Sequence, residues 1–196
     1  MENRTPLSGQ SSYDISHVKK VLLNLLNKPF NNESLNQKEF DFIIDIIEIY
    51  PYILDEIGFK PDKFYVLMDK NEILATEILF KLINCNLFED YLTLFIEKAW
   101  SVNSLKIINK LIQSVELPSC FIKLYLQHII KEYKEQNSLE QKLRLAKLFS
   151  FFILNLLTHE HITVDVIPTS INVILDKNYK DPDIIKLRET IISYRN

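Results

Sequence analysis

LIQSVELPSCFIKLYLQHIIKEY, the stretch from residue 111 to residue 133, decides how this chain is predicted to fold. Pro118 cannot continue a helix that precedes it, because it lacks an amide hydrogen and its ring clashes with the preceding turn. It also pushes Leu117 toward an extended backbone, so the first helix is expected to end near Val115. Proline is well tolerated as the first residue of a helix. The stretch therefore predicts two helices joined by one compact break, with the second beginning at Pro118.

The second helix of this stretch carries a broad apolar face. Its members recur at the three- and four-residue spacing of an α-helix, namely Phe121, Ile122, Tyr125, Leu126, Ile129 and Tyr133. Such a face has to pack against other helices. Pro118, Phe121 and Ile122 are therefore predicted to hold two helices together at the centre of the domain.

Helical signals continue along almost the whole chain. Residues 1–13 are polar and predict a disordered tail, whereas residues 14–196 predict one all-helical domain. Gly58 is placed to end a short helix as its C-terminal glycine, and Pro168 either kinks a helix or marks its start. Capping residues and prolines give the other expected helix starts, which are Asp14 or Ser16, Ser34, Pro61, Asn71, Leu87, Asn103, Ser138 with Gln141, Thr163 and Asp181-Pro182.

The pattern as a whole predicts an all-α fold. Roughly ten helices with short connections and no alternating strand pattern favour antiparallel helix pairs in a solenoid-like single domain. Only two glycines occur among 196 residues, which excludes glycine-rich phosphate loops and disfavours a hairpin-rich β protein. The two cysteines, Cys85 and Cys120, lie in apolar segments and are predicted to be buried, reduced thiols.

No membrane segment or secretion signal is predicted. The longest apolar candidate, residues 145–157, is interrupted by Lys147, Ser150 and Asn155. The polar N-terminus lacks the apolar core of a signal peptide. The protein is therefore expected to be soluble and intracellular.

The net charge of −3 is unevenly distributed. Residues 33–62 contain eight acids and two bases, a net charge of −6, which leaves +3 for the remainder of the chain. That positive charge is spread out, unlike the dense basic stripe of a nucleic-acid-binding protein. The charged residues are therefore interpreted as the solvent-exposed faces of helices.

No catalytic constellation or cofactor site is predicted. His159-Glu160-His161 is the one cluster that suggests a metal site, but no third ligand is near it in sequence. A histidine at a helix C-terminus is also favoured by the helix dipole. The carboxylates Asp41 and Asp45 interleave with an apolar stripe, which is typical of the solvent-exposed face of an amphipathic helix.

Aromatic residues are the more informative group. Tyr91, Trp100, Tyr125 and Tyr133 combine an apolar body with a polar tip, so each could line the edge of a binding groove. For any single one of them, packing in the core is the favoured role.

Three segments match a known family in order and in length. They are ATEILFKLINCNLFEDYLTLFIE (75–97), SVNSLKIINKLIQSVELPSCFIKLYLQHII (101–130) and LRLAKLFSFFILNLL (143–157). IYPYILDEIGFKPDKFYVLM (49–68) adds a weaker likeness. From Leu74 to about Ile192, the chain resembles the C-terminal domain of subunit eleven of the CCR–NOT mRNA deadenylase complex. The most distinctive positions are Ser104, Asn109, Lys110, Leu111, Val115, Leu117, Pro118, Phe121, Ile122, Leu124 and Tyr125, with Arg144 and Lys147 on matching positions of the third segment.

The resemblance implies a non-catalytic accessory domain in mRNA decay, in the cytoplasm and nucleus, that recruits other proteins. The chain leaves no room for the family's N-terminal, scaffold-docking domain, so scaffold docking is not expected of these residues. We expect a partner to bind through a short peptide segment in an apolar groove. The residues predicted to contact it are Tyr125, Tyr133, Arg144 and Lys147.

Two alternatives stay open from the sequence. In the first, the chain is a helical array that binds RNA directly, with Lys142, Arg144 and Lys147 contacting phosphates. In the second, it is an unrelated helical adaptor. An enzyme is not expected, because the sequence offers no cluster of convergent titratable groups.

Overall fold

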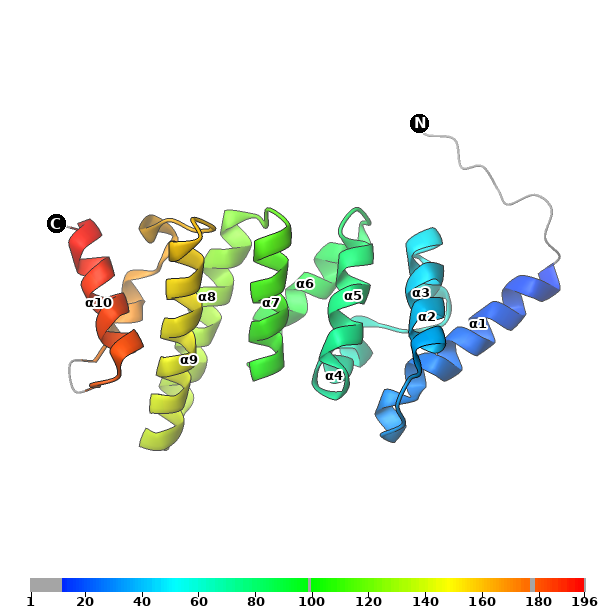
Figure 1. Cartoon of the computed structure of the whole chain (residues 1–196), viewed down its shortest axis with the longest axis horizontal. Coiled ribbons are helices and arrows are strands. Elements are labelled where there is room, and N and C mark those ends of the chain that lie inside the picture. Colours follow the sequence, from blue (N-terminus) through cyan, green and yellow to red (C-terminus); the bar gives the residue numbers. More distant parts are fainter. Residues whose placement is uncertain (1–11, 99, 177–178, 196) are drawn as a thin grey trace. The chain divides into compact units, whose positions relative to one another are not determined.

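The computed structural model describes residues 12–98, 100–176 and 179–195 (Figure 1). These residues form ten α-helices, three short 3₁₀ helices and no β-strand, so the predicted all-α class is confirmed. They divide into two compact units, unit 1 up to Tyr91 and unit 2 from Leu92 onward. Helix α6, Leu87–Glu97, spans this boundary. The single domain over residues 14–196 therefore stays a prediction.

The helix bounds follow most of the expected caps and prolines. Unit 1 contains α1 (Ser12–Asn27), η1 (Pro29–Asn31), α2 (Gln37–Ile49), α3 (Ile53–Glu56), α4 (Pro61–Lys70) and α5 (Glu72–Leu82). Unit 2 contains α7 (Val102–Ser114), α8 (Ser119–Glu135), α9 (Leu139–Thr158), η2 (Val164–Val166), η3 (Thr169–Val173) and α10 (Pro182–Arg195). Among the described residues, no helix is long and apolar enough to cross a membrane.

The N-terminal tail was predicted over residues 1–13. Helix α1 begins at Ser12, ahead of both expected caps, so residues 12 and 13 belong to a helix instead. The rest of the predicted tail lies outside the described residues.

The break at Pro118 is present, one residue displaced from its predicted position. Pro118 is the N-cap of α8 with ψ 131°, so the helix begins at Ser119. The extended ψ turns the chain before the first helical residue. Pro118 itself is exposed, whereas Phe121 and Ile122 are buried in the core of unit 2.

Tyr125 lies at the centre of that core, with only 1% of its surface exposed. Its ring stacks on Phe121 at 6.2 Å and meets Phe95 of α6 and Phe152 of α9 edge-on, at 6.5 and 6.3 Å between centroids. Such pairs add about 0.5–1.5 kcal/mol each beyond the area they bury. Burial raises the pKa of the Tyr125 hydroxyl far above its ordinary range. The residue therefore ties three helices together.

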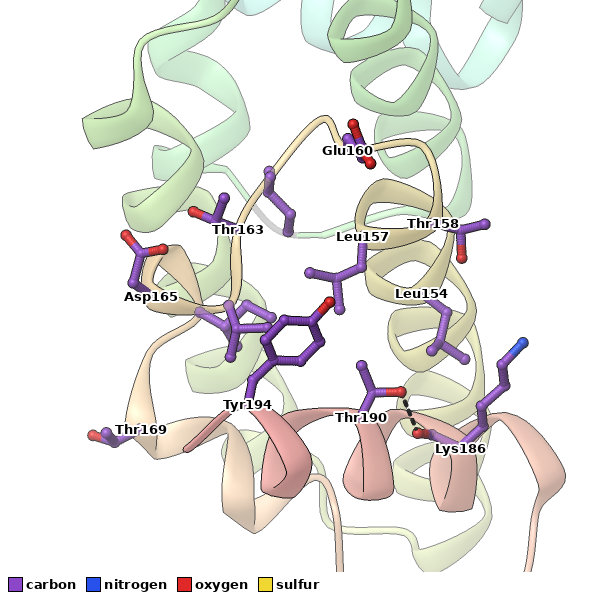
Figure 2. A pocket seen from close by; sticks show the side chains of 13 residues that line it. Leu154, Leu157, Thr158, Glu160, Thr163, Asp165, Thr169, Lys186, Thr190 and Tyr194 are labelled. Atoms are coloured by element: carbon purple, nitrogen blue, oxygen red, sulfur yellow. Dashed lines mark hydrogen bonds between the residues drawn. The ribbon is translucent and has the colours of Figure 1, made fainter. Parts of the chain in front are cut away.

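Unit 2 ends with two different helix pairings. Only residues 136–138 join α8 to α9, a short loop typical of antiparallel neighbours. In contrast, α10 runs in the same general direction as α9 (Figure 1). Lys147, in the first half of α9, pairs with Asp181, just before α10, with an Nζ–Oδ2 distance of 3.0 Å. The long connection and α10 enclose a cavity against the end of α9 (Figure 2).

The connection was predicted to contain a helix capped by Thr163, and this is wrong. The chain forms the short 3₁₀ helices η2 and η3 in its place. Pro168 disfavours a helical backbone at the residue before it, and Ile167 is extended with ψ 119°. The proline therefore divides the segment into two short pieces.

Gly58 ends helix α3 in the left-handed conformation, with φ +68°. Its N–H donates to the carbonyl of Asp55 at 3.0 Å, and the N–H of Phe59 donates to Leu54 at 2.8 Å. This pair of bonds is the Schellman motif, in which the residue after the C-cap adopts positive φ. Glycine suits the position because it has no Cβ to strain.

Helix α9 ends in the same motif without glycine. The N–H of Glu160 donates to Leu157 at 3.1 Å, and the N–H of His161 donates to Leu156 at 2.9 Å. Glu160 has φ +58°, a conformation that costs an ordinary residue about 1–2 kcal/mol. The backbone at Glu160 is therefore fixed at some cost in stability.

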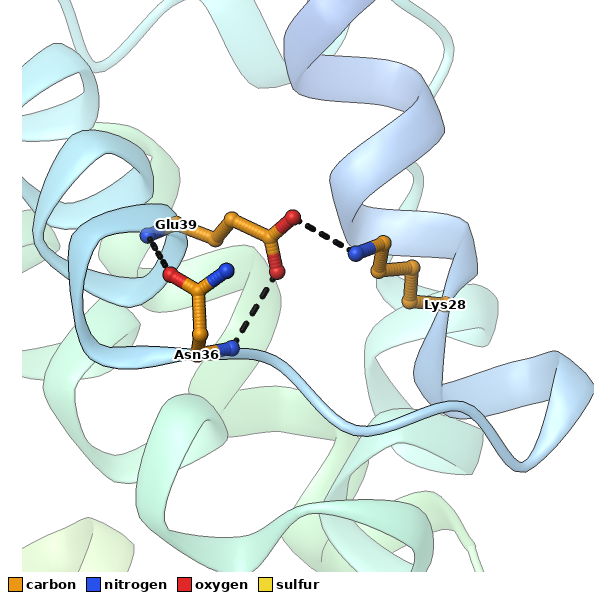
Figure 3. Close-up of polar contacts among 3 residues, drawn as sticks. All are labelled: Lys28, Asn36 and Glu39. Carbon is orange, nitrogen blue, oxygen red and sulfur yellow. Dashed lines mark hydrogen bonds and ion pairs between the residues drawn. The ribbon is translucent and has the colours of Figure 1, made fainter.

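The cap of helix α2 corrects another expectation (Figure 3). The cap is Asn36 rather than Ser34, because Asn36 accepts a hydrogen bond from the N–H of Glu39 and Glu39 bonds back to the N–H of Asn36. Glu39 also pairs with Lys28 at 2.6 Å. Lys28 and then the backbone of Asn36 lower the pKa of the Glu39 carboxyl.

The two Schellman positions predict opposite responses to substitution. Gly58→Ala should lower the free energy of unfolding by about 1–2 kcal/mol through backbone strain alone, since its new Cβ meets no atom within 4 Å. Glu160→Gly should raise it by about 0.5–1 kcal/mol, because relief of strain outweighs the entropy of glycine in the unfolded chain. Urea unfolding measures both changes. Glu160→Ala is the control, because it removes the carboxylate and keeps the strain, and an equal gain in that variant would contradict the explanation.

Tyr125 should behave as a core residue in a substitution series. Tyr125→Ala should destabilise the chain by about 3–5 kcal/mol, the usual cost of deleting a buried aromatic ring. Tyr125→Phe keeps the three ring contacts and should change the free energy of unfolding by less than about 1 kcal/mol. Thermal and urea unfolding provide the comparison. Similar losses in both variants would show that the hydroxyl, and not the ring, matters.

Candidate partner-binding surface

The outer face of helix α9 carries an exposed stripe. Arg144, Lys147 and Phe151 follow one another at spacings of three and four residues, so they lie on one side of the helix. All three are exposed, and Phe151 exposes 63% of its surface. A single exposed apolar side chain is ordinary on a protein surface, so the interest of Phe151 comes from Leu154, one turn farther along α9, which lines a cavity.

The stripe leads to the cavity at the end of α9. This cavity has a volume of about 970 Å³ and lies among the last turns of α9, the connection after it, and α10 (Figure 2). Leu154, Ile162 and Ile167 form a buried apolar floor. Tyr194 of α10 directs its ring into the cavity, yet 73% of its surface is exposed. Few protein groups cover that ring.

The rim of the cavity is polar, and its charges are separated. Glu160 and Asp165 lie on the connection, whereas Lys186 lies on α10, across the cavity from Asp165 (Figure 2). Thr190 is also on α10 and donates its hydroxyl to the carbonyl of Lys186 at 2.8 Å. The remaining hydroxyl groups of the lining belong to Thr158, Thr163 and Thr169.

A smaller cavity of about 420 Å³ lies beside the Pro118 break. Leu117, Pro118 and Ile122 line it on one side, and the connection lines it on the other. Glu160, Ile162 and Thr163 line both cavities, so this short segment separates them. Part of the stretch 111–133 therefore borders this smaller cavity, although most of the apolar side chains of the stretch face the core.

The residues predicted to contact a partner are only partly at the surface. Tyr125 is buried in the core, which corrects its predicted contact with a partner. Tyr133 is buried too, and its hydroxyl bonds to that of Tyr179 at 2.8 Å. Lys147 is exposed but pairs with Asp181. Burial pushes the pKa of Asp181 upward, but Lys147 and nearby backbone N–H groups outweigh it and lower the pKa overall. Arg144 alone is exposed and forms no ion pair with a described carboxylate.

Sequence reasoning missed Phe151 and Tyr194. Phe151 lies within the apolar run 145–157 and Tyr194 was given no role, because no local signal separates an outward aromatic from an inward one. For Phe151, one clue was available in the sequence. Phe151 and Phe152 are neighbours on a helix and point in different directions, so they cannot both face the core. Tyr91 and Trp100, the other candidates for a groove edge, are buried and half-buried respectively. The Tyr91 hydroxyl donates to the carbonyl of Phe59 at 2.9 Å.

The histidines and cysteines form no cluster of ligands in the part of the chain that is described. The rings of His159 and His161 are 6.0 Å apart, and no group of three His, Cys, Asp or Glu residues is placed to hold a metal. Cys120 is exposed on the first turn of α8 and Cys85 is half-buried, which corrects the prediction that both thiols are buried. Cys120 faces outward because Phe121 and Ile122 occupy the inward positions beside it.

Comparison with known proteins gives a consistent result. A curated relative from Dictyostelium discoideum, described as CCR4-NOT transcription complex subunit 11, is 25% identical over 146 residues. The aligned region covers 74% of this chain and 22% of that relative, so the chain spans less than a quarter of the relative's length. A family model with the same description matches residues 68–191, which include the α9 stripe and most of the cavity lining. Since that match covers well over half of the chain, the chain belongs to the CCR4-NOT transcription complex subunit 11 family.

Proposed function

We propose that this chain acts as a non-catalytic accessory part of the CCR4–NOT deadenylase complex. In this role it recruits other proteins during mRNA decay, translation regulation and gene silencing, in the cytoplasm and the nucleus. Family membership supports its place in the complex. The recruiting role is supported by the surface that unit 2 displays.

The observation that carries the proposal is the exposed apolar surface at the end of α9. Phe151 and Tyr194 are both more than half exposed, and they lie on the two helices that border a cavity of about 970 Å³. Aromatic side chains next to a concave surface are the usual anchors of protein interfaces. Burying such a ring completely stabilises a complex by about 1.5–3 kcal/mol, so leaving two exposed favours a role in binding.

Direct RNA binding is the second candidate, and the contacts of its three predicted residues weaken it. The Nζ of Lys142 lies 5.8 Å from the centre of the Tyr133 ring. Lys147 pairs with Asp181. Among the described residues, neither Lys142 nor Arg144 forms an ion pair, but two such charges fall short of the several that act together in phosphate binding. A protein partner is therefore favoured.

Affinity purification tests the proposal in cells. The tagged chain should recover the same set of CCR4–NOT-associated proteins with or without ribonuclease, because direct contact with a protein does not depend on RNA. The double variant Arg144→Glu, Phe151→Asp should reduce their recovery by about tenfold or more, equivalent to about 1.4 kcal/mol of binding free energy.

Lys131→Glu is the matched control, because it reverses an exposed basic residue on α8, and it should leave recovery unchanged. Quantitative mass spectrometry provides the measurement, and circular dichroism verifies that all variants fold. Recovery that disappears with ribonuclease would support RNA binding in place of protein recruitment.

A further inference from the structure

We infer that the α9 stripe and the large cavity form one groove that binds a short peptide segment with acidic residues at one end, apolar residues in the middle and basic residues at the other. This inference rests on the proposed recruiting function and specifies the chemistry of its partner. It is carried by the order of charges along the groove and by the exposed aromatic residues between them.

The length of the groove follows from helix geometry. Arg144, Lys147, Phe151 and Leu154 share one face of α9, and Thr158 continues it into the cavity. The fourteen steps from Arg144 to Thr158 span about 21 Å at 1.5 Å per residue. An extended peptide covers that length with about six or seven residues, at roughly 3.3 Å each. The occupant is therefore a short linear segment.

One end of the groove is positively charged. Arg144 and Lys147 lie on the first half of α9, and Lys186 joins them from α10. The ion pair between Lys147 and Asp181 sets the start of α10 at this level. Lys186 lies five residues farther along α10, beside Leu154 at the edge of the cavity (Figure 2). Asp181 neutralises part of the charge of Lys147, which leaves Arg144 at the end of the groove and Lys186 nearer its middle as the contacts for acidic residues.

The other end is negatively charged. Glu160 and Asp165 both lie on the connection after α9, and both are exposed. The carboxylate of Glu160 projects from a backbone that two hydrogen bonds hold in the left-handed conformation. A rigidly held carboxylate loses little freedom when a partner binds, so it can contribute more affinity than a mobile one.

The middle of the groove is apolar. Phe151 and Tyr194 expose most of their surface, and Leu157 is half-buried between the helices that carry them (Figure 2). Aliphatic or aromatic side chains of the partner fit here, because they would cover the two rings, which follow one another along the groove. Opposite charges at the two ends then fix the direction in which the segment lies, since reversing it would place like charges together.

Peptide display provides the test, with random ten-residue peptides as the probe. On the full chain, selection should enrich peptides that carry an acid, then an apolar residue, then Lys or Arg, in one chain direction. On the Glu160→Lys, Asp165→Lys variant, the basic end of the enriched peptides should change to Asp or Glu. On Arg144→Glu, the acidic end should change to Lys or Arg, and Phe151→Asp should weaken binding of the enriched peptides by about tenfold or more.

Glu135→Lys is the matched control, since it reverses an exposed acid on α8 outside the groove, and it should select the same peptides as the unaltered chain. Thermal unfolding verifies that each variant folds. Enrichment without charge order, enrichment that ignores the substitutions, or no enrichment would each overturn the inference.

Three further outcomes are informative. Sedimentation that shows a dimer, lost in the Phe151→Asp variant, would assign the groove to a second copy of this chain and overturn the inference. If cellular proteins are still recovered while no peptide is selected, the inference fails and the proposed function stands. If charge-ordered peptides are selected but no CCR4–NOT-associated protein is recovered, the proposed function fails instead.

Discussion

The arrangement of unit 2 depends on the burial of Tyr125 among the rings of Phe95, Phe121 and Phe152. Because Phe152 is fixed against Tyr125, the rotation of α9 about its own axis is fixed as well. Neighbouring residues on a helix point about 100° apart, so the side chain before Phe152 has to face away from the core. The exposure of Phe151, and with it the direction of the basic stripe, is therefore a consequence of core packing.

The second determinant is the path of the chain after α9. An immediate turn would have placed the next helix antiparallel to α9 and against its length. Instead, the connection after α9 leads back along that helix, and Lys147, in the first half of α9, pairs with Asp181 just before α10 begins. The returning segment contains only short 3₁₀ helices, whose few side chains do not fill the space between the two long helices. The large cavity results from this incomplete filling.

The sequence predicted the helices well because their boundaries depend on local interactions. Asn71, Pro61 and the Asp181-Pro182 pair act on their nearest turns, and their helices begin where expected. Ser34 failed as a cap because Asn36, two residues later, has Glu39 in position to complete a capping box. The candidate site was harder to predict. Whether Tyr125 or Phe151 faces solvent depends on which helices pack beside them, and periodicity describes a face without stating what covers it. Arg144 was identified only through the family resemblance.

The pairing of Lys147 with Asp181 also has a consequence for how unit 2 opens. It closes a loop of 34 residues, which costs about 3 kcal/mol of chain entropy. Contacts between α9 and α10 have to offset this loss of chain entropy, because the connection contributes little regular structure of its own. Detachment of α10 would expose Ile184, Leu187 and Ile191, which are buried when this helix is docked. Since α10 supplies one wall of the cavity, the large cavity exists only in the closed state, and the stability of α10 docking sets the fraction of molecules able to bind.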